Sequence, residues 1–409
     1  MTALTSVAEA VAVLLAAAPR PGPAAENPPL AEALGRVLAA PVQAVVSAPP
    51  VDNSAVDGFA VRLGDTSLDR RLPVSQRIAA GQAAQPLQRG TAARIFTGAP
   101  IPPGADAVVM QEHAEVDGLL VQFSRLPGSG ANIRARGQDF AAGASVLMPG
   151  QVLRAQDIAL AAAAGARHLP VVPRPKVAFF STGDELMDVG QPDTLQAGDG
   201  SRIFDSNRPL VHALLTGLGC EPIDLGMVPD EREATASALR RAAARADLVL
   251  TTGGASVGEA DHLVQVLRDA GALRLWRLAI KPGKPFAHAM LEGRPVLCLP
   301  GNPAAVLVGM LILCRPFLLR MQGVADVAPA GIPIPAGFAL GSGQRETYLR
   351  VRLSVDGRGA PRLECHPNQS SGVLTAAVWA DGLARVPAGA QVAVGDPLTY
   401  LPFSALARL

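Results

Sequence analysis

This 409-residue sequence is short of several residue types, and each shortage excludes a class of protein. Its four cysteines form no C-x-x-C pair, so neither a zinc ribbon nor a disulfide framework is expected. The 36 basic and 35 acidic residues give a net charge of +1, which leaves no excess charge for binding nucleic acid or a membrane surface. No apolar run reaches the roughly 20 residues that a membrane span requires, and the longest, 304–314, ends at Arg315-Pro316. These features predict a cytoplasmic protein with no nucleic-acid or membrane partner.

Lysine is scarce in this chain. Only three of the 36 basic residues are lysines, and two of them, Lys281 and Lys284, stand together in K-P-G-K-P. An ammonium group is a compact point charge, whereas a guanidinium group is a planar fork. The lysine pair therefore indicates a site for a small tetrahedral dianion. The alternative is a solvated basic loop, and the near absence of lysine elsewhere argues against it.

Two proline-rich segments divide the chain into three regions, so a multidomain protein with α/β and β parts is expected. Residues 1–170 predict an N-terminal helical stalk with an inserted β-rich lobe at about 48–142. Residues 171–325 alternate strands and helices, which predicts a central doubly wound, mostly parallel α/β domain. Residues 332–409 contain short alternating runs, which predict a small C-terminal β-barrel.

The middle region carries its polar motifs where the expected strands end, and ligands bind at that edge of a parallel sheet. The strand at 248–250 leads into T-T-G-G-A-S-V-G-E-A-D-H. Around Gly253 and Gly254 the backbone N–H groups are accessible to an anion such as phosphate. Asp261 follows as a hard oxygen ligand for Mg²⁺. A tight turn capped by Asp261 is the alternative, but the small and polar residues and two acids exceed what a turn needs.

Other strand ends carry S-T-G-D-E-L at 181–186, Asp230, and L-P-G-N-P at 299–303. Helix capping explains the first two nearly as well as ligand binding does. The third precedes a helix whose N-terminus adds positive potential. Nucleophilic catalysis has little support, since no cysteine has a polar, activating neighbourhood, and the Gly-Gly turn is not a Walker A loop because Gly-Lys-Ser/Thr is missing.

Seven ordered motifs together resemble the molybdopterin molybdotransferase family, which includes the bacterial MoeA proteins and the related E domain of gephyrin. They are D-N-S-A-x-D-G-x-A at 52–60, T-G-A-P at 97–100, S-T-G-D-E-L, D-S-N-R at 205–208, G-G-x-S-V-G, K-P-G-K-P and P-G-N-P. This resemblance implies that adenylylated molybdopterin and molybdate react with Mg²⁺ to give molybdenum cofactor and AMP. It also implies a cytoplasmic homodimer with shared active sites, and a handover of product to molybdoenzymes or later maturation proteins.

The resemblance further implies catalytic roles for five residues. Asp261 would hold the metal together with Glu185. Asp230 would assist in placing the substrate or the metal. Asp57 and Thr97 would reach into the site from the partner subunit.

Two further groups of binding residues follow from the resemblance. Molybdate would be held by Lys281 and Lys284, helped by Arg350 and Ser371. The substrate-binding residues would be Thr182, Gly183, Asp184, Gly253, Gly254, Ser256, Pro300, Gly301, Asn302 and Pro303.

Two positions depart from the family pattern, with Ala305 in place of the usual serine and Gln138 in place of the usual glutamate. These departures bear on affinity more than on reaction type. Two alternatives stay open, namely an adenylyltransferase that uses only the middle fold and a non-catalytic binding or scaffold protein. Tungstate also stays open beside molybdate, because the two oxyanions share shape and charge.

Overall fold

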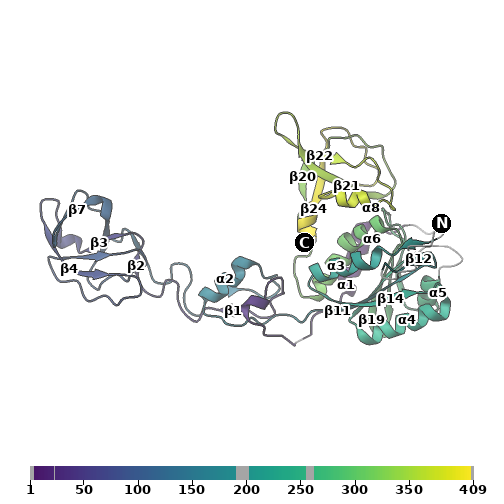
Figure 1. Ribbon diagram of the computed structural model, residues 1–409, viewed down its shortest axis with the longest axis horizontal. Coiled ribbons are helices and arrows are strands. Elements are labelled where there is room, and N and C mark those ends of the chain that lie inside the picture. The colour runs from purple at the N-terminus through teal and green to yellow at the C-terminus, as the bar shows by residue number, and fades with distance from the viewer. Residues whose placement is uncertain (1–3, 23, 190–201, 255–261, 407–409) are drawn as a thin grey trace. The chain divides into compact units, whose positions relative to one another are not determined.

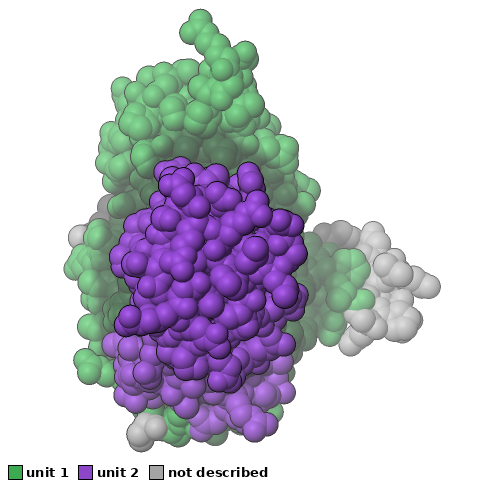
Figure 2. All heavy atoms as spheres, turned by 90° about the vertical axis from the view of Figure 1, so that its left-hand side faces the viewer, with its two compact units in different colours: residues 1–25, 172–409 green, residues 26–171 purple. Residues whose placement is uncertain are grey.

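The computed structural model describes residues 4–22, 24–189, 202–254 and 262–406, which form two compact units. Unit 1 consists of residues 1–25 and 172–409, and unit 2 of residues 26–171 (Figure 2). The boundary expected at residue 170 adjoins the observed change of unit. The first 25 residues, expected as part of the N-terminal stalk, instead pack with the middle region.

Unit 1 is built around a six-stranded sheet. Its strands are β11 (Lys176–Thr182), β14 (Glu221–Val228), β15 (Leu248–Thr252), β16 (Leu273–Trp276), β18 (Ala287–Leu291) and β19 (Arg294–Leu299). They lie in the order β14-β11-β15-β19-β18-β16, and the first four run parallel, whereas β18 is antiparallel to both of its neighbours. The expected mostly parallel sheet is therefore confirmed. A two-stranded ribbon of β12 (Leu186–Met187) and β13 (Ile203–Phe204) lies outside this sheet.

Helices cover both faces of the central sheet (Figure 1). One face carries α1 (Val7–Ala17), α3 (Asn207–Gly217), α6 (Pro303–Gly309), η5 (Met310–Cys314) and α7 (Arg315–Met321), and the other α4 (Arg232–Arg245) and α5 (His262–Asp269). The sequence of α4 explains its packing, because Thr235, Ala238, Leu239 and Ala242 recur at helical spacing and are buried. Covered on both faces, β15 is buried along its whole length.

The segment α6–η5–α7 is one continuous helical run. The apolar run of the sequence ends at Arg315-Pro316, and the helix continues past Pro316 by way of the π-helical turn η5. Proline has no N–H and crowds the preceding helical turn, and a π-helical turn accommodates such a break in the regular pattern. By length and hydropathy alone Pro303–Met321 could cross a membrane, yet 89% of it is buried inside the structure. Its apolar surface therefore serves the core of unit 1.

The C-terminal region forms a second six-stranded sheet in unit 1. Its elements are β17 (Ile280–Lys281), β20 (Ile332–Pro335), β21 (Glu346–Val355), β22 (Pro361–Cys365), β23 (Gly382–Val386), β24 (Pro397–Pro402), α8 (Leu374–Trp379) and α9 (Phe403–Leu406). The strands β20 to β24 pair antiparallel, around a core that includes Leu349, Val351 and Leu363. Strand β17 comes from the middle region and pairs in parallel with β21. This pairing brings the K-P-G-K-P loop to the C-terminal sheet.

Unit 2 contains a β-rich lobe and a smaller base. The lobe has β2 (Asn53–Ser54), β3 (Gly58–Val61), η2 (Leu63–Asp65), β4 (Leu72–Ile78), β5 (Ala92–Ile95), β6 (Ala107–Met110), η3 (Gln111–His113), β7 (Ala114–Asp117), β8 (Leu120–Phe123) and β9 (Ile133–Arg134). The base has η1 (Leu30–Glu32), β1 (Val42–Gln43), β10 (Ser145–Leu147) and α2 (Ala155–Ala163). A bridge between Ala48 and Phe140 closes the lobe near its expected limits.

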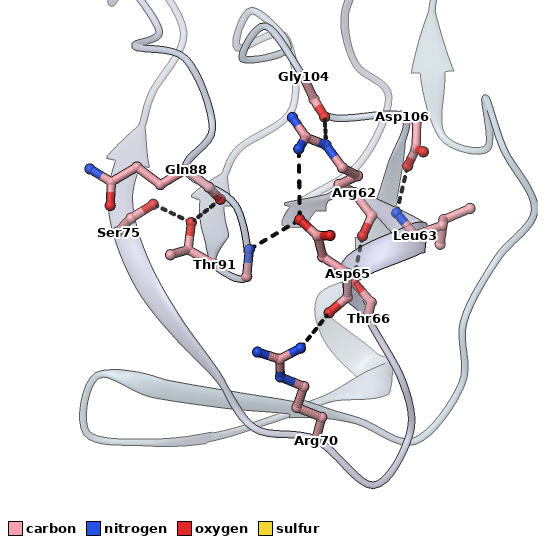
Figure 3. Close-up of polar contacts among 11 residues, drawn as sticks. Arg62, Leu63, Asp65, Thr66, Arg70, Ser75, Gln88, Thr91, Gly104 and Asp106 are labelled. Carbon is pink, nitrogen blue, oxygen red and sulfur yellow. Dashed lines mark hydrogen bonds and ion pairs between the residues drawn. The ribbon is translucent and has the colours of Figure 1, made fainter.

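Polar contacts hold the connections of the lobe in place (Figure 3). Arg62, just after β3, donates from Nε to the carbonyl oxygen of Gly104 at 3.0 Å and lies 3.7 Å from a carboxylate oxygen of Asp65. The Asp106 carboxylate accepts the Leu63 N–H at 2.8 Å. Because such exposed ion pairs add little free energy, their role is to fix loop conformation rather than to stabilise the lobe.

The lobe's stability depends on Phe123, whose side chain is 1% exposed and packs edge-on against Phe59. Phe123→Ala leaves a cavity and is expected to lower the free energy of unfolding of unit 2 by about 3–5 kcal/mol. Hydrogen exchange of peptides from residues 26–171 should accelerate. Both tryptophans, Trp276 and Trp379, lie in unit 1, so the fluorescence unfolding midpoint should stay in place. If the fluorescence midpoint instead falls together with the stability of unit 2, the two units do not unfold separately. Val116→Ala, at an exposed position of the same unit, is the control.

Candidate functional site

A cavity of about 340 Å³ lies at the carboxyl ends of β11 and β15. Thr182, which ends β11, and Thr252, which ends β15, both line it. The Ser181 and Thr252 hydroxyls are 2.8 Å apart and join the two strand ends. The Thr182 hydroxyl is buried and has no hydrogen-bond partner among the described residues. An unpartnered buried hydroxyl beside a cavity is suited to a polar ligand.

The Gly-Gly turn expected to bind phosphate lines the same cavity through Gly253 and Gly254. Gly253 has a positive φ of 84°, and its N–H donates to the carbonyl oxygen of Leu299 at 3.1 Å. A Cβ atom at Gly253 would overlap the carbonyl oxygen of Thr182. Only glycine therefore allows this turn to pass so close to β11. Ser256 and Asp261 lie outside the described residues.

Three expected acids come together at this cavity. Glu185 and Asp230 line it, and the Asp184 carboxylate accepts the Asp230 N–H at 3.2 Å. Burial raises the pKa of Asp230; His262 opposes this rise, while the charges of Asp184 and Glu185 add to it. Within the part of the chain that the structure describes, no group of three or more His, Cys, Asp or Glu residues is placed to hold a metal ion. The acids thus form a region of negative charge without a complete metal site.

Asp205 and Asn207, for which the sequence suggested no individual role, also line this cavity. Asp205 Oδ1 accepts the N–H groups of Asn207 and Arg208 at 2.9 and 3.2 Å, as a helix-capping residue does at the start of α3. Asn207 Nδ2 donates to the carbonyl oxygen of Gly301 at 2.7 Å. The remaining side-chain oxygens, Asp205 Oδ2 and Asn207 Oδ1, are buried without a partner among the residues described. The D-S-N-R motif was the signal that could have identified both.

A second cavity, of about 230 Å³, lies beside the K-P-G-K-P loop and is lined by Lys281, Arg350 and Gln369, among others. Arg350 is 1% exposed. Its Nη2 donates to the carbonyl oxygen of Ser370 at 3.0 Å, but its buried Nε has no partner in the described chain. Burial lowers the pKa of Arg350, which shows how unfavourable this position is for a cation without an anion nearby. The cavity is therefore suited to a small oxyanion.

The P-G-N-P loop at the start of α6 borders the first cavity, and Ala305 of α6 lies next to Gly283 in the K-P-G-K-P loop beside the second. Gly301, Asn302 and Pro303 line the first cavity. Ala304 N–H donates to the carbonyl oxygen of Ser371 at 3.0 Å, which ties the start of α6 to the C-terminal region. Of the four residues expected to hold the oxyanion, Lys281 and Arg350 line the second cavity, whereas exposed Lys284 and half-buried Ser371 lie outside its wall.

Asp57 and Thr97 lie together in unit 2. One oxygen of Asp57 accepts the N–H and the O–H of Thr97, at 2.8 and 2.7 Å. These two hydrogen bonds lower the pKa of Asp57, and Arg94 adds to the effect. The Asp57 carboxylate therefore stays ionised well below neutral pH.

Comparisons with known proteins agree along the whole chain. Residues 5–165 match the MoeA N-terminal region (domain I and II), residues 178–320 a probable molybdopterin-binding domain, and residues 334–403 the MoeA C-terminal region (domain IV). The molybdopterin molybdenumtransferase of Haemophilus influenzae is 43% identical over 297 residues, 72% of each chain. That of Synechococcus elongatus is 34% identical over 407 residues, 97% of this chain and 98% of the relative. The chain belongs to the MoeA family.

Solved structures support the same conclusion for the fold. The MoeA protein of Pyrococcus horikoshii OT3 superimposes with a TM-score of 0.83 at 28% identity, covering 98% of this chain and 100% of the other. The MoeA resemblance found from seven motifs, and the multidomain α/β and β architecture, are thereby confirmed.

In this MoeA family member, Asp230→Asn is expected to stabilise unit 1 slightly at pH 7. Because the folded-state pKa of Asp230 is raised, its ionised form is disfavoured in the folded protein. The penalty is full above that raised pKa and disappears below the ordinary aspartate pKa of about 3.9. The gain should be under about 1 kcal/mol, since the carboxyl group is largely solvated.

Urea unfolding followed by tryptophan fluorescence, at pH 7 and at successively lower pH, measures this gain. The difference between Asp230→Asn and wild type should shrink as the pH falls toward the ordinary aspartate pKa. A gain that does not change with pH would contradict the electrostatic cause.

Proposed function

We propose that this chain inserts molybdenum into molybdopterin. Its substrates are adenylylated molybdopterin and molybdate, and its products are molybdenum cofactor and AMP. The observation that supports this most is that α6 connects two cavities of different chemistry. Its first residue, Pro303, lines one cavity, and its Ala305 lies next to Gly283 in the loop whose Lys281 lines the other. The first cavity has an unpartnered hydroxyl group, carboxylate oxygen and amide oxygen beside a Gly-Gly turn. The second has a buried guanidinium group and an ammonium group.

The first cavity would bind the adenylylated molybdopterin. Thr182 and Gly254 would face its phosphate groups with a hydroxyl and an N–H donor, Gly253 allows the turn to pass close to β11, and the N-terminus of α6 adds positive potential. Gly183, Asp184, Ser256 and the 300–303 loop would complete the contacts. Asn207 Oδ1 and Asp205 Oδ2 are unpartnered acceptors, so they suit the N–H donors of a heterocycle rather than phosphate oxygens.

Mg²⁺ would be held by Asp261 and Glu185, since carboxylate oxygens are hard ligands and Mg²⁺ commonly combines one or two of them with substrate phosphates. The pKa of Asp230 is raised mainly by burial and further by the charges of Asp184 and Glu185, and a cation at this place would favour the ionised carboxylates. When bound, Mg²⁺ would neutralise charge on the phosphoanhydride oxygens. Asp230 and Asp184 would keep the substrate and the other acids in position.

The second cavity would bind molybdate through Lys281 and Arg350. The unpartnered Nε of Arg350 is a donor that a tetrahedral oxyanion can satisfy, and charge-assisted hydrogen bonds of this kind are strong. Lys284 and Ser371 would approach it from the ends of their loops. The proximity of the K-P-G-K-P loop to Ala305 of α6 would place the oxyanion close to the molybdopterin.

The remaining expectations concern assembly. Asp57 and Thr97 would act in the active site of a partner subunit of a homodimer, where the low pKa of Asp57 keeps its carboxylate charged. The enzyme would be cytoplasmic, would need neither nucleic acid nor membrane, and would pass its product to molybdoenzymes or later maturation proteins.

The central test is molybdate-dependent release of AMP from adenylylated molybdopterin. Lys281→Ala should raise the molybdate concentration for half-maximal rate about tenfold or more, because one charge-assisted contact is lost. Asp261→Ala should abolish AMP release. The third lysine supplies a matched control, since Lys176 is exposed and 3.9 Å from Glu221, and Lys176→Ala should behave as wild type. Unchanged molybdate dependence in Lys281→Ala would remove the oxyanion role.

The shared active site is tested by mixing two inactive variants, Asp57→Asn and Asp230→Asn, under conditions of subunit exchange. If each site uses Asp230 of one subunit and Asp57 of the other, a mixed dimer carries one intact site. A one-to-one mixture should then regain about a quarter of the wild-type rate. A mixture that stays inactive after exchange, shown by mass spectrometry of the dimers, would place both residues in a single subunit's site.

A further inference from the structure

Unit 1 contains a third cavity, of about 370 Å³, at the other end of the central sheet. Pro175, in its wall, directly precedes β11, and Asp247 directly precedes β15, while Arg294 is the first residue of β19. All three lie at the amino ends of parallel strands. The first cavity of the proposed active site lies at the carboxyl ends of β11 and β15, and the second is lined by the K-P-G-K-P loop and the C-terminal region. A ligand in the third cavity would therefore not touch the reacting groups.

The wall of this third cavity is positively charged. Arg20, Arg174 and Arg294 line it, and Asp247 is the one carboxylate among its lining residues. Asp247 is already engaged, since one oxygen lies 3.4 Å from Arg294 Nη1 and the other accepts the Lys176 N–H at 2.9 Å. The guanidinium groups of Arg20 and Arg174 make no hydrogen bond or ion pair with the residues that the structure describes. Two positive charges are thus left without compensation.

Proline residues restrict both uncompensated arginines. Arg20 stands between Pro19 and Pro21, and Arg174 between Pro173 and Pro175, and all of these residues line the cavity. Proline fixes its own φ and disfavours the helical region for the residue before it. The backbone at Arg20 and Arg174 is therefore largely organised before a ligand binds, which reduces the entropy lost on binding.

We propose that this cavity binds a small multivalent oxyanion of the phosphate class, with Arg20, Arg174 and Arg294 as its ligands. Guanidinium groups donate in pairs to phosphate oxygens, so unpaired arginines suit such an anion. The cavity of about 370 Å³ has room for two linked phosphate groups, and pyrophosphate carries enough charge to engage all three guanidinium groups.

Binding here has a consequence for the chain connections. The segments that carry Arg20 and Arg174 are the two through which the chain enters unit 2 at residue 26 and leaves it at residue 171. An anion that bridges the two arginines holds these segments together. The site is therefore a point at which a phosphate compound acts on the protein away from the reaction, independently of the proposed activity.

Isothermal titration of pyrophosphate into the full chain, at constant ionic strength and without Mg²⁺ or molybdate, tests the site. Wild type should bind one equivalent saturably, and the double variant Arg20→Gln/Arg174→Gln should bind at least about tenfold more weakly, since two charge-assisted contacts are lost. Arg245→Gln, at the exposed end of α4, is the matched control and should bind as wild type. Lys281→Ala should also bind normally, which separates this site from the oxyanion cavity of the proposed active site.

Further measurements identify which phosphate compound binds and exclude misfolding of the double variant. Weaker binding of both inorganic phosphate and AMP than of pyrophosphate supports a ligand with two linked phosphates. Pyrophosphate should raise the melting temperature of wild type but not of the double variant, whose own fluorescence unfolding midpoint should match wild type. Equal pyrophosphate binding by wild type and the double variant, or heat that never saturates, overturns the proposal.

Discussion

Burial of the central sheet on both faces is the constraint on which the rest of unit 1 depends. With α3 and α6 on one face and α4 and α5 on the other, the inner strands β11, β15 and β19 pair on both sides and are buried from water along almost their whole length. Polar side chains can then meet a ligand only where the strands end. Thr182, Thr252 and the Gly-Gly turn lie at that edge because the parallel strands finish together there.

The pairing of β17 with β21 involves only two residues of each strand, but it helps to form the second cavity. It holds Lys281 against the C-terminal sheet, where Arg350 is already buried. A buried guanidinium with an unpartnered Nε is costly by itself, and this cost is offset when an anion is bound. The stability of the folded protein and the binding of an anion at the second cavity are therefore linked, as at other sites where function lowers stability.

Local pattern predicted the alternating elements of the middle region well. The strand expected at 248–250 corresponds to β15, because a buried strand is a continuous apolar run. The helix α4, with its 3.6-residue period of buried residues, fits the expected alternation of strands and helices. The antiparallel strands β16 and β18 were not anticipated. Strand β18 reads A-H-A-M-L, without β-branched residues, so its conformation depends on pairing with β19 rather than on intrinsic preference. The placement of the first helix in unit 1 likewise depends on contacts with α7 that are distant in sequence.

Motifs and periodicities are local properties of the chain, so the sequence was enough to identify the family, the order of its domains and the chemical types of its loops. Which of those loops share a cavity became known from the tertiary structure. It brought Lys281 to Arg350 and excluded Lys284 from the same wall, and it left oxygens of Asp205 and Asn207 without partners. It also gathered three arginines at the opposite end of the sheet. The physical reason is that burial and hydrogen-bond satisfaction depend on contacts between residues far apart in the chain.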